Sequence, residues 1–154
     1  MLEKRKEEPL ILLSGLIHRE YAVILLLSVM SVKVTEDGRA VVMDEEGEVD
    51  VTREVLNMLP QLTSACALSI KNLSIHEDYI DDIKEILNII ALSMYLSVAL
   101  RDSGVLEKVL MMVAYAISNA RSDRVRGIIK ERTIKELKEL GFDELVEAFQ
   151  KIAG

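Results

Sequence analysis

Cysteine, proline and glycine are scarce in this chain. Its 154 residues contain one Cys, two Pro and seven Gly. A single cysteine excludes an intrachain disulfide and is typical of a reducing, cytoplasmic compartment. The glycines are scattered, so the sequence has no glycine-rich loop that could bind a phosphate. With half of the residues apolar and 29% charged, the composition indicates one globular, helix-rich domain over residues 1–154.

Histidine is almost absent, which limits metal and hydrolytic chemistry. His18 and His76 each stand beside acidic residues, but neither belongs to the HxxxH or HExxH spacing of helical metal sites. No serine or cysteine lies in the sharp turn that presents a catalytic nucleophile. Cys66 lies in the apolar stretch TSACALSI, which indicates a small buried side chain. We therefore expect a protein that is not an enzyme and that carries no cofactor or metal.

Four carboxylates are the best candidate for a metal site. Asp78, Asp81, Asp82 and Glu85 would share one face of a helix and could bind Mg²⁺ together with a second acidic helix. The sequence contains no such second helix. Because acidic residues also stabilise the positive start of a helix, a solvated helix start is the preferred interpretation.

An apolar run near the N-terminus resembles a signal sequence or a membrane anchor. His18, Arg19 and Glu20 interrupt this run at its centre, where charges are costly in lipid. No small-residue cleavage site follows it. We expect a soluble protein without membrane contact, in which residues 8–30 are helical.

The longest uninterrupted apolar segment covers residues 86–100. Only Asn88, Ser93 and Ser97 are polar within it. A helix that is apolar nearly all round has no solvated face, and fifteen residues are too few to span a bilayer. The segment therefore predicts a central helix that other helices surround.

Short β-branched runs and acidic turns occupy residues 31–51. Alternating valines and the Asp37-Gly38 pair predict an acidic β-hairpin, with a third short strand as an option. Helical patterns follow it to the end of the chain. The expected fold is therefore mainly α: a single-domain bundle of about six helices, with the hairpin inserted after the first helical region.

Boundary residues divide the helical part of the sequence. Thr52 is a predicted N-cap, and Pro60 either kinks that helix or opens the next one. Ser74 begins a capping box that predicts a long helix over residues 75–101. Residues 102–104 predict a stop and restart. Gly141 suits the C-cap of a helix over about 123–140, and Asp143 is a predicted cap of the last one.

Three segments, 21–30, 86–100 and 105–120, carry more apolar surface than a two-layer packing covers. Self-association or docking in a larger assembly would bury the excess, and an intrachain bundle is the alternative. Met94, Met111 and Met112 could instead surround an apolar ligand, which would make the protein a small-molecule-binding or regulatory bundle.

The main electrostatic feature is a basic segment in an acidic chain of net charge −7. Residues 121–138 contain seven cations and three carboxylates, which gives this segment a net charge of +4. At helical spacing Arg121, Arg124 and Lys135 fall on one stripe, with Arg126 and Lys130 toward another. Arg132 is placed with the second stripe. The candidate contact residues for phosphate or a partner are Arg121, Arg124, Arg126, Lys130, Arg132 and Lys135.

Three interpretations of this basic segment stay open. It is a solvated surface helix with (i, i+4) ion pairs, a phosphate-binding face for nucleic acid, or a face that docks the acidic hairpin or the acidic helix start of a neighbouring copy in a head-to-tail assembly. No aromatic residue lies among the cations, which disfavours stacking of single-stranded bases.

The size and element order resemble the small helical subunit of archaeal type I CRISPR effector complexes. The resemblance spans the helix 8–30, the hairpin 31–51 and the helices 52–152, and it includes no sequence motif. It implies a non-enzymatic subunit of an RNA-guided antiviral complex, present in several copies, whose residues Arg121, Arg124, Arg126 and Lys130 contact phosphate. The acidic hairpin departs from what a strand-binding subunit would need. Only two Gln and four Asn occur beside abundant Glu, Lys and Arg, which favours a thermophilic source.

Overall fold

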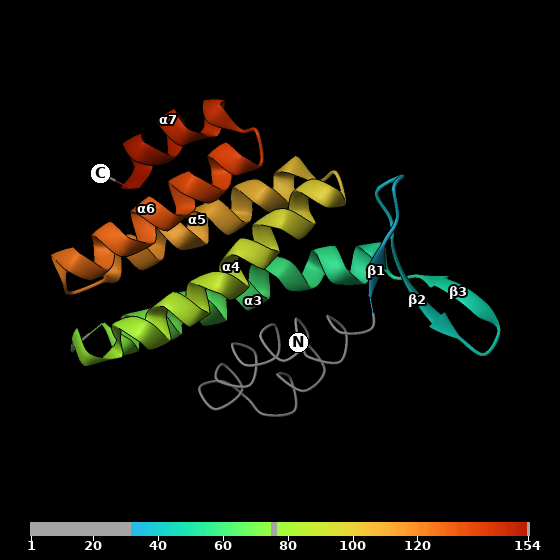
Figure 1. Ribbon diagram of the computed structural model, residues 1–154, viewed down its shortest axis with the longest axis horizontal. Coiled ribbons are helices and arrows are strands. Elements are labelled where there is room, and N and C mark those ends of the chain that lie inside the picture. The colour runs from blue at the N-terminus through green and yellow to red at the C-terminus, as the bar shows by residue number, and fades with distance from the viewer. Residues whose placement is uncertain (1–31, 75–76, 154) are drawn as a thin grey trace.

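The computed structural model describes residues 32–74 and 77–153, and Figure 1 shows a small sheet followed by packed helices. The helix expected over residues 8–30, together with His18 and His76, lies outside these residues. The strands are β1 (Lys33–Val34), β2 (Ala40–Asp44) and β3 (Gly47–Asp50). The helices are α3 (Thr52–Leu73), the 3-10 helix η1 (Glu77–Tyr79), α4 (Ile80–Ala99), α5 (Ser103–Asn119), α6 (Asp123–Glu139) and α7 (Asp143–Ala153). The mainly helical fold with a small sheet is confirmed, with five α-helices in the described part instead of about six in the whole chain.

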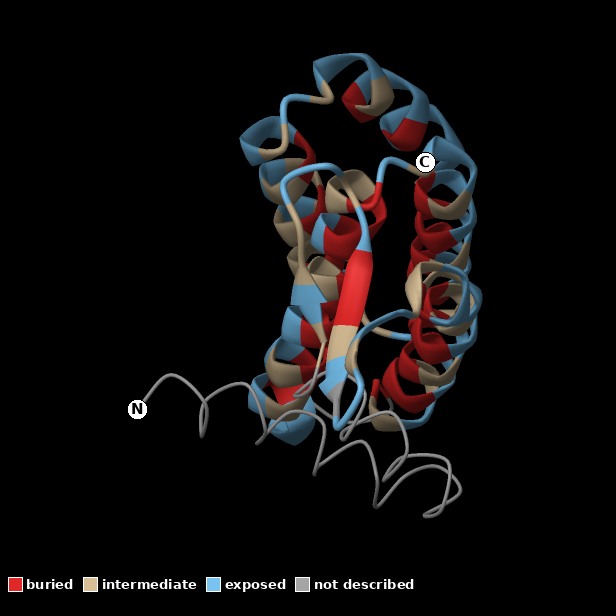
Figure 2. Ribbon diagram, turned by 90° about the vertical axis from the view of Figure 1, so that its right-hand side faces the viewer, coloured by how far each residue is buried: buried red, intermediate tan, exposed pale blue. Residues whose placement is uncertain are grey.

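Helix α5 is the element that all other described α-helices share. It packs against α3, α4, α6 and α7, while α6 also packs against α4 and α7. Figure 2 shows that buried residues line the sides on which the helices face one another. The segment 86–100 forms most of α4 and is largely buried, as its apolar sequence predicts. Among the described α-helices, the one that packs against all the others is nevertheless α5, whereas α4 packs against α3, α5 and α6.

The hydroxyl groups within α4 are satisfied by the helix itself. Ser93 donates a hydrogen bond to the carbonyl of Ile89 at 3.1 Å, and Ser97 donates to that of Ser93 at 2.7 Å. Because these bonds stay within one helix, two serines can lie in the core without polar partners from other elements. None of the helices in residues 32–74 and 77–153 is long and apolar enough to span a membrane.

Two of the predicted helix boundaries are confirmed in detail. The Asp102 carboxylate accepts a hydrogen bond from the Val105 N–H at 3.0 Å and caps α5. Gly141 ends α6 with φ of +84°, and its N–H donates to the carbonyl of Lys138 at 3.1 Å. The next N–H, that of Phe142, donates to the carbonyl of Leu137 at 2.9 Å. These are the two hydrogen bonds of a glycine C-cap.

At other predicted boundaries the structure differs in detail, and two predicted capping hydroxyl groups bond elsewhere. Thr52 is the first residue of α3, and its hydroxyl accepts from the Ala40 N–H at 2.9 Å instead of capping the helix. Ser74 ends α3, and its hydroxyl donates to the carbonyl of Lys71 at 2.9 Å. Pro60 lies inside α3 and does not open a new helix. Asp143 is the first residue of α7, and the predicted helix 75–101 is divided between η1 and α4.

The sheet is antiparallel with the strand order β1-β2-β3, so the optional third strand is present. Val34 pairs with Ala40, and Val42 pairs with Val49. Ala40 and Val41 are buried, and β2 packs against α3 at this end. Beyond them the ribbon leaves the bundle, and the Met43 side chain is 70% exposed. We call residues 42–50 the distal hairpin.

Arg101 joins the sheet to the helices. It follows α4 in a left-handed conformation, φ +58°, a position that normally favours glycine. Its guanidinium donates a hydrogen bond to the Glu36 carbonyl at 3.1 Å, and its side chain lies against Gly38. The turn between β1 and β2 is therefore held to the corner between α4 and α5.

Gly38 should be sensitive to substitution. It has φ +85°, and an added Cβ would lie 3.0 Å from Cδ of Arg101. Gly38→Ala should lower the free energy of unfolding by about 1–2 kcal/mol, because the left-handed conformation disfavours a side chain. Gly127→Ala is the matched control, since it lies inside α6 with nothing within 4 Å of the added carbon. It should raise stability by about 0.5–1 kcal/mol. Urea unfolding of both variants would contradict this account if they shifted in the same direction.

The same turn should make stability depend on pH. Hydrogen bonds from the Thr35 hydroxyl and from Arg39 Nε, the latter at 2.9 Å, lower the pKa of Asp37. A folded-state pKa below the unfolded value of about 3.9 means stability that is present above that value and is lost as pH falls through the folded pKa. Asp37→Asn should remove this part of the acid destabilisation, measured as urea midpoints between neutral and low pH. Thr35→Val should have the same effect. If the urea midpoints of both variants fell at low pH as much as that of the wild type, this role of Asp37 would be refuted.

Candidate functional site

The basic segment forms α6 and the loop that precedes it. Val125, Ile129, Thr133 and Leu137 recur every four residues and are buried, which fixes the opposite side of the helix toward solvent. The Ser122 hydroxyl accepts from the Val125 N–H at 3.4 Å at the start of the helix. This arrangement decides where each predicted contact residue lies.

The six candidate residues do not form one surface. Arg121 and Arg124 are exposed at the start of α6. Arg126 and Lys130 are partly buried, and Arg126 pairs with Asp123 at 2.7 Å. The Arg126 Nε is buried and has no hydrogen-bond partner within the part of the chain that the structure describes. Helical spacing places Arg126 and Lys130 on a different side of α6 from Lys135.

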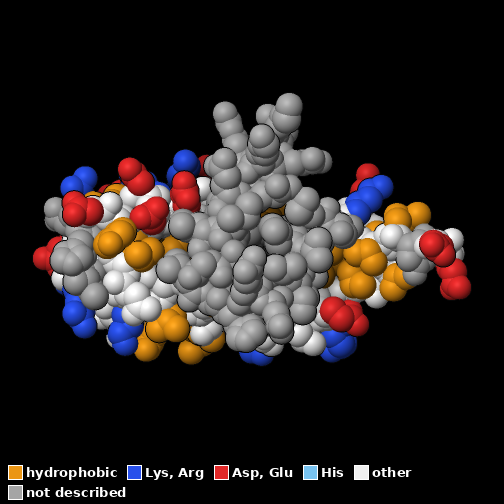
Figure 3. All heavy atoms as spheres, turned by 90° about the horizontal axis from the view of Figure 1, so that it is seen from below, with side chains coloured by type: hydrophobic (Ala, Val, Ile, Leu, Met, Phe, Trp, Pro, Cys, Tyr) orange, Lys and Arg blue, Asp and Glu red, His pale blue; other side chains and the backbone are white. Residues whose placement is uncertain are grey.

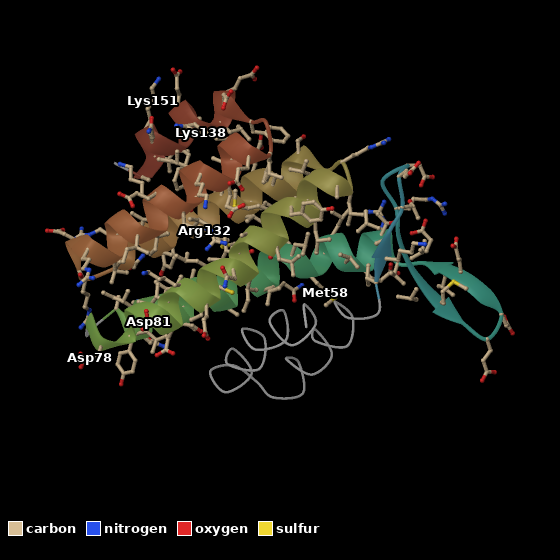
Figure 4. All side chains as sticks on the ribbon, viewed as in Figure 1. Met58, Asp78, Asp81, Arg132, Lys138 and Lys151 are labelled. Atoms are coloured by element: carbon tan, nitrogen blue, oxygen red, sulfur yellow. The ribbon has the colours of Figure 1, made fainter. Side chains whose placement is uncertain are left out.

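Arg132 and Lys135 line a hollow of about 430 Å³ between α4 and α6, which we call the α4–α6 hollow. Arg132, labelled in Figure 4, is held by an ion pair with Glu136 at 2.8 Å. The prediction that Arg132 lies with Arg126 and Lys130 is therefore wrong, because it shares this hollow with Lys135. The lining residues are Lys84, Glu85, Leu87 and Asn88 from α4, and Ile128, Glu131, Arg132 and Lys135 from α6.

Lys84 is the functional candidate that sequence reasoning missed. It stands among Asp81, Asp82 and Glu85, so its segment was interpreted as an acidic helix start. Packing of α4 against α6 brings it to Arg132 and Lys135, which makes three cations and two carboxylates around one hollow. The signal that could have revealed it is its spacing from Asn88: the two polar residues are four positions apart and share the exposed side of α4.

The acidic candidates do not form a metal site in the described residues. Asp78 lies in η1, one turn before Asp81 at the start of α4. Figure 4 places Asp78 and Asp81 near the junction of η1 and α4. Glu85 instead lines the α4–α6 hollow. Within residues 32–74 and 77–153, no group of three or more His, Cys, Asp or Glu side chains could hold a metal ion.

A second hollow is apolar and lies between α5 and α7. Its volume is about 240 Å³, and we call it the α5–α7 hollow. Met111 and Ile152 stand at this hollow with 66% of each side chain exposed. The expectation that Met111 lies in the interior with Met94 is wrong. Met111 lies on the solvent-exposed side of α5, whereas Met94 is buried. The lining residues are Glu107, Leu110, Met111, Leu145, Ala148, Phe149 and Ile152.

A third hollow, of about 460 Å³, lies where α3 and α5 begin. Arg53 and Lys108 line it together with Asp50 and Asp102, so its charges balance. Asp102 already caps α5. This hollow therefore offers no net charge to a ligand.

Cys66 is buried within α3, as its apolar surroundings predict. Burial raises the pKa of its thiol, because the charged thiolate is disfavoured away from water. A thiol in this state is a poor nucleophile and a poor metal ligand. Cys66 therefore adds packing and no evident chemistry.

Comparison with known proteins gives no independent guide to function. No protein-family model matches the chain, and neither a curated protein nor a solved structure matches it. The resemblance to a CRISPR subunit accordingly stays a prediction. The chemistry of the α4–α6 and α5–α7 hollows is what points to a function.

Proposed function

We propose that this chain is a non-enzymatic structural subunit that acts by helix-mediated self-association. The observation that carries the proposal is the apolar surface around the α5–α7 hollow. Met111 and Ile152 are each 66% exposed there, and Tyr115 is exposed one turn further along α5. Large apolar side chains grouped around an apolar hollow are typical of protein contact surfaces.

A second copy of the chain is the partner that this surface fits best. The surface carries both a hollow and two protruding side chains, so it can be complementary to itself. In a two-fold contact, Met111 or Ile152 of each copy would enter the hollow of the other. A groove between two packed helices also accepts the side-chain ridge of a third helix. Self-association would thus cover apolar surface that α7, only eleven residues long, leaves exposed.

Charge introduced at this surface should weaken the association. Met111→Glu and Ile152→Glu should each raise the dissociation constant about tenfold or more, because burial of one such side chain contributes about 1.5–3 kcal/mol. Sedimentation equilibrium over a range of protein concentrations measures this directly. Leu68→Glu is the matched control, since Leu68 is exposed on α3 and does not line the hollow.

Two outcomes would contradict the proposal. One is a wild-type protein that stays monomeric at all concentrations, and the other is equal weakening by Leu68→Glu. A monomer that binds an apolar fluorescent probe, and loses it in Met111→Glu, would instead favour the small-molecule-binding bundle.

A second candidate function is contact with nucleic acid, as in the small subunit of an RNA-guided complex. The observation that favours it is the placement of Lys84, Arg132 and Lys135 around one hollow. Arg121 and Arg124 are exposed at the start of the same helix, α6. Cations that neutralise phosphates release counterions, so such binding would weaken as salt rises. Glu85 and Glu131 in the lining oppose it.

Titration of a labelled single-stranded RNA and a labelled DNA duplex tests this second candidate. Lys84→Glu with Lys135→Glu should weaken binding about tenfold or more and flatten its salt dependence. Lys151→Glu, an exposed charge on α7, should leave the affinity unchanged. Wild-type protein that fails to bind at low salt would exclude this candidate.

A further inference from the structure

The distal hairpin extends beyond the helical bundle (Figure 1). Figure 3 shows it projecting from one end of the molecule, with carboxylates beside exposed hydrophobic side chains. Met43 is 70% exposed, and Val49 is 39% exposed on the adjacent strand. Two strands without a covering layer are marginally stable in water. A ribbon of this kind is better explained as one half of a contact than as a finished surface.

The charges of the distal hairpin select the partner. Residues 44–50 contain five carboxylates and no cation: Asp44, Glu45, Glu46, Glu48 and Asp50. Because β3 is an edge strand, it could pair with the same strand of another copy. Like charges facing one another oppose that pairing. A surface that carries cations is therefore a better partner for the hairpin than the same strand of another copy.

The α4–α6 hollow is such a surface on this same chain. Lys84 and Lys135 line it, both side chains are exposed, and neither forms an ion pair within residues 32–74 and 77–153. Leu87 and Ile128 supply apolar lining between the charges. The hollow thus offers cations to Glu45 and Glu48 and apolar contact to Met43. Its own carboxylates, Glu85 and Glu131, make a few separate negative charges a better fit than a continuous phosphate backbone.

The hairpin cannot occupy the hollow of its own chain. Figure 1 shows the start of α4 and the sheet at opposite ends of the bundle. Lys84 and the corner at Arg101 are separated by seventeen residues of sequence, which is about 25 Å along α4. The hairpin points further away from the bundle than that corner does. Any contact must therefore join two copies.

We infer that the distal hairpin of one copy docks in the α4–α6 hollow of a second copy. This inference rests on the proposed function, because both require self-association, but it uses separate surfaces. The two contacting surfaces differ, so the contact is head to tail and leaves a free hairpin and a free hollow at the two ends of the assembly. Such contacts produce rings or open chains, depending on the rotation between copies.

A charge-swap experiment tests this contact. Glu45→Lys, Glu46→Lys and Glu48→Lys together change the net charge of residues 44–50 from −5 to +1. Lys84→Glu with Lys135→Glu changes the net charge of the hollow's lining from +1 to −3. At about 50 mM salt, each reversed protein alone should lose head-to-tail association about tenfold or more, measured by sedimentation velocity. A 1:1 mixture of the two should regain it, because every hairpin then meets a hollow of opposite charge. Far-UV circular dichroism checks that both variants fold.

Matched controls change charge at exposed positions outside the contact. Lys138→Glu alters α6 without lining the hollow, and Glu147→Lys alters α7. Both should assemble like the wild type. Loss of association in the reversed proteins without recovery in the mixture would overturn the inference. If the mixture did not recover and Lys84→Glu with Lys135→Glu also abolished RNA binding, the cations of the hollow would be assigned to nucleic acid.

Salt separates failure of this inference from failure of the proposed function. At about 500 mM salt the charge contact should be screened, while an apolar α5–α7 contact should persist. Association that persists at high salt and ignores both charge reversals would overturn the head-to-tail contact alone. No association at either salt concentration would overturn both.

Discussion

Packing against α5 is the constraint on which the rest of the structure depends. Leu106, Val109, Val113 and Ile117 lie on its buried side, and all four of the other described α-helices contact it. Two of those helices, α6 and α7, carry much of the exposed chemistry. Because α6 buries Val125 and Ile129, it must turn Lys135 outward and place Arg132 beside α4. The position of the charges is therefore a consequence of where the apolar residues are buried.

The same logic explains which parts of the fold are visible in the sequence. Asp102 and Gly141 mark helix ends correctly because each acts through its own backbone or that of residues close in sequence. Thr52 and Ser74 carry equally good local signals and are misleading. Thr52 accepts from β2 instead, and the Ser74 hydroxyl accepts from the Arg121 N–H at 3.4 Å, a residue distant in sequence. Local patterns predict structure only where no tertiary contact competes for the same group.

The candidate surfaces were less predictable than the fold. Charge counts identified the basic segment, but they could not show that Lys84 faces Arg132, because that pairing arises when α4 packs on α6. The number of apolar residues indicated more hydrophobic surface than one bundle would cover, but not where on the fold that surface lies. Met94 and Met111 belong to equally apolar segments, yet one is buried and the other is 66% exposed. What decides whether each methionine is buried is the side of its helix that faces the neighbouring helices, and composition does not contain this information.

The two proposed contacts use different surfaces and differ in symmetry, so both can form in one assembly. A contact through the α5–α7 hollow joins identical surfaces and closes after two copies. A contact between the distal hairpin and the α4–α6 hollow joins different surfaces and can continue from one copy to the next. Pairs linked head to tail would form a larger array, whose extent falls with rising salt while its paired units persist. The corner at Arg101 then gains a mechanical role, because it fixes the sheet, and with it the projecting hairpin, to the helices that carry the hollow.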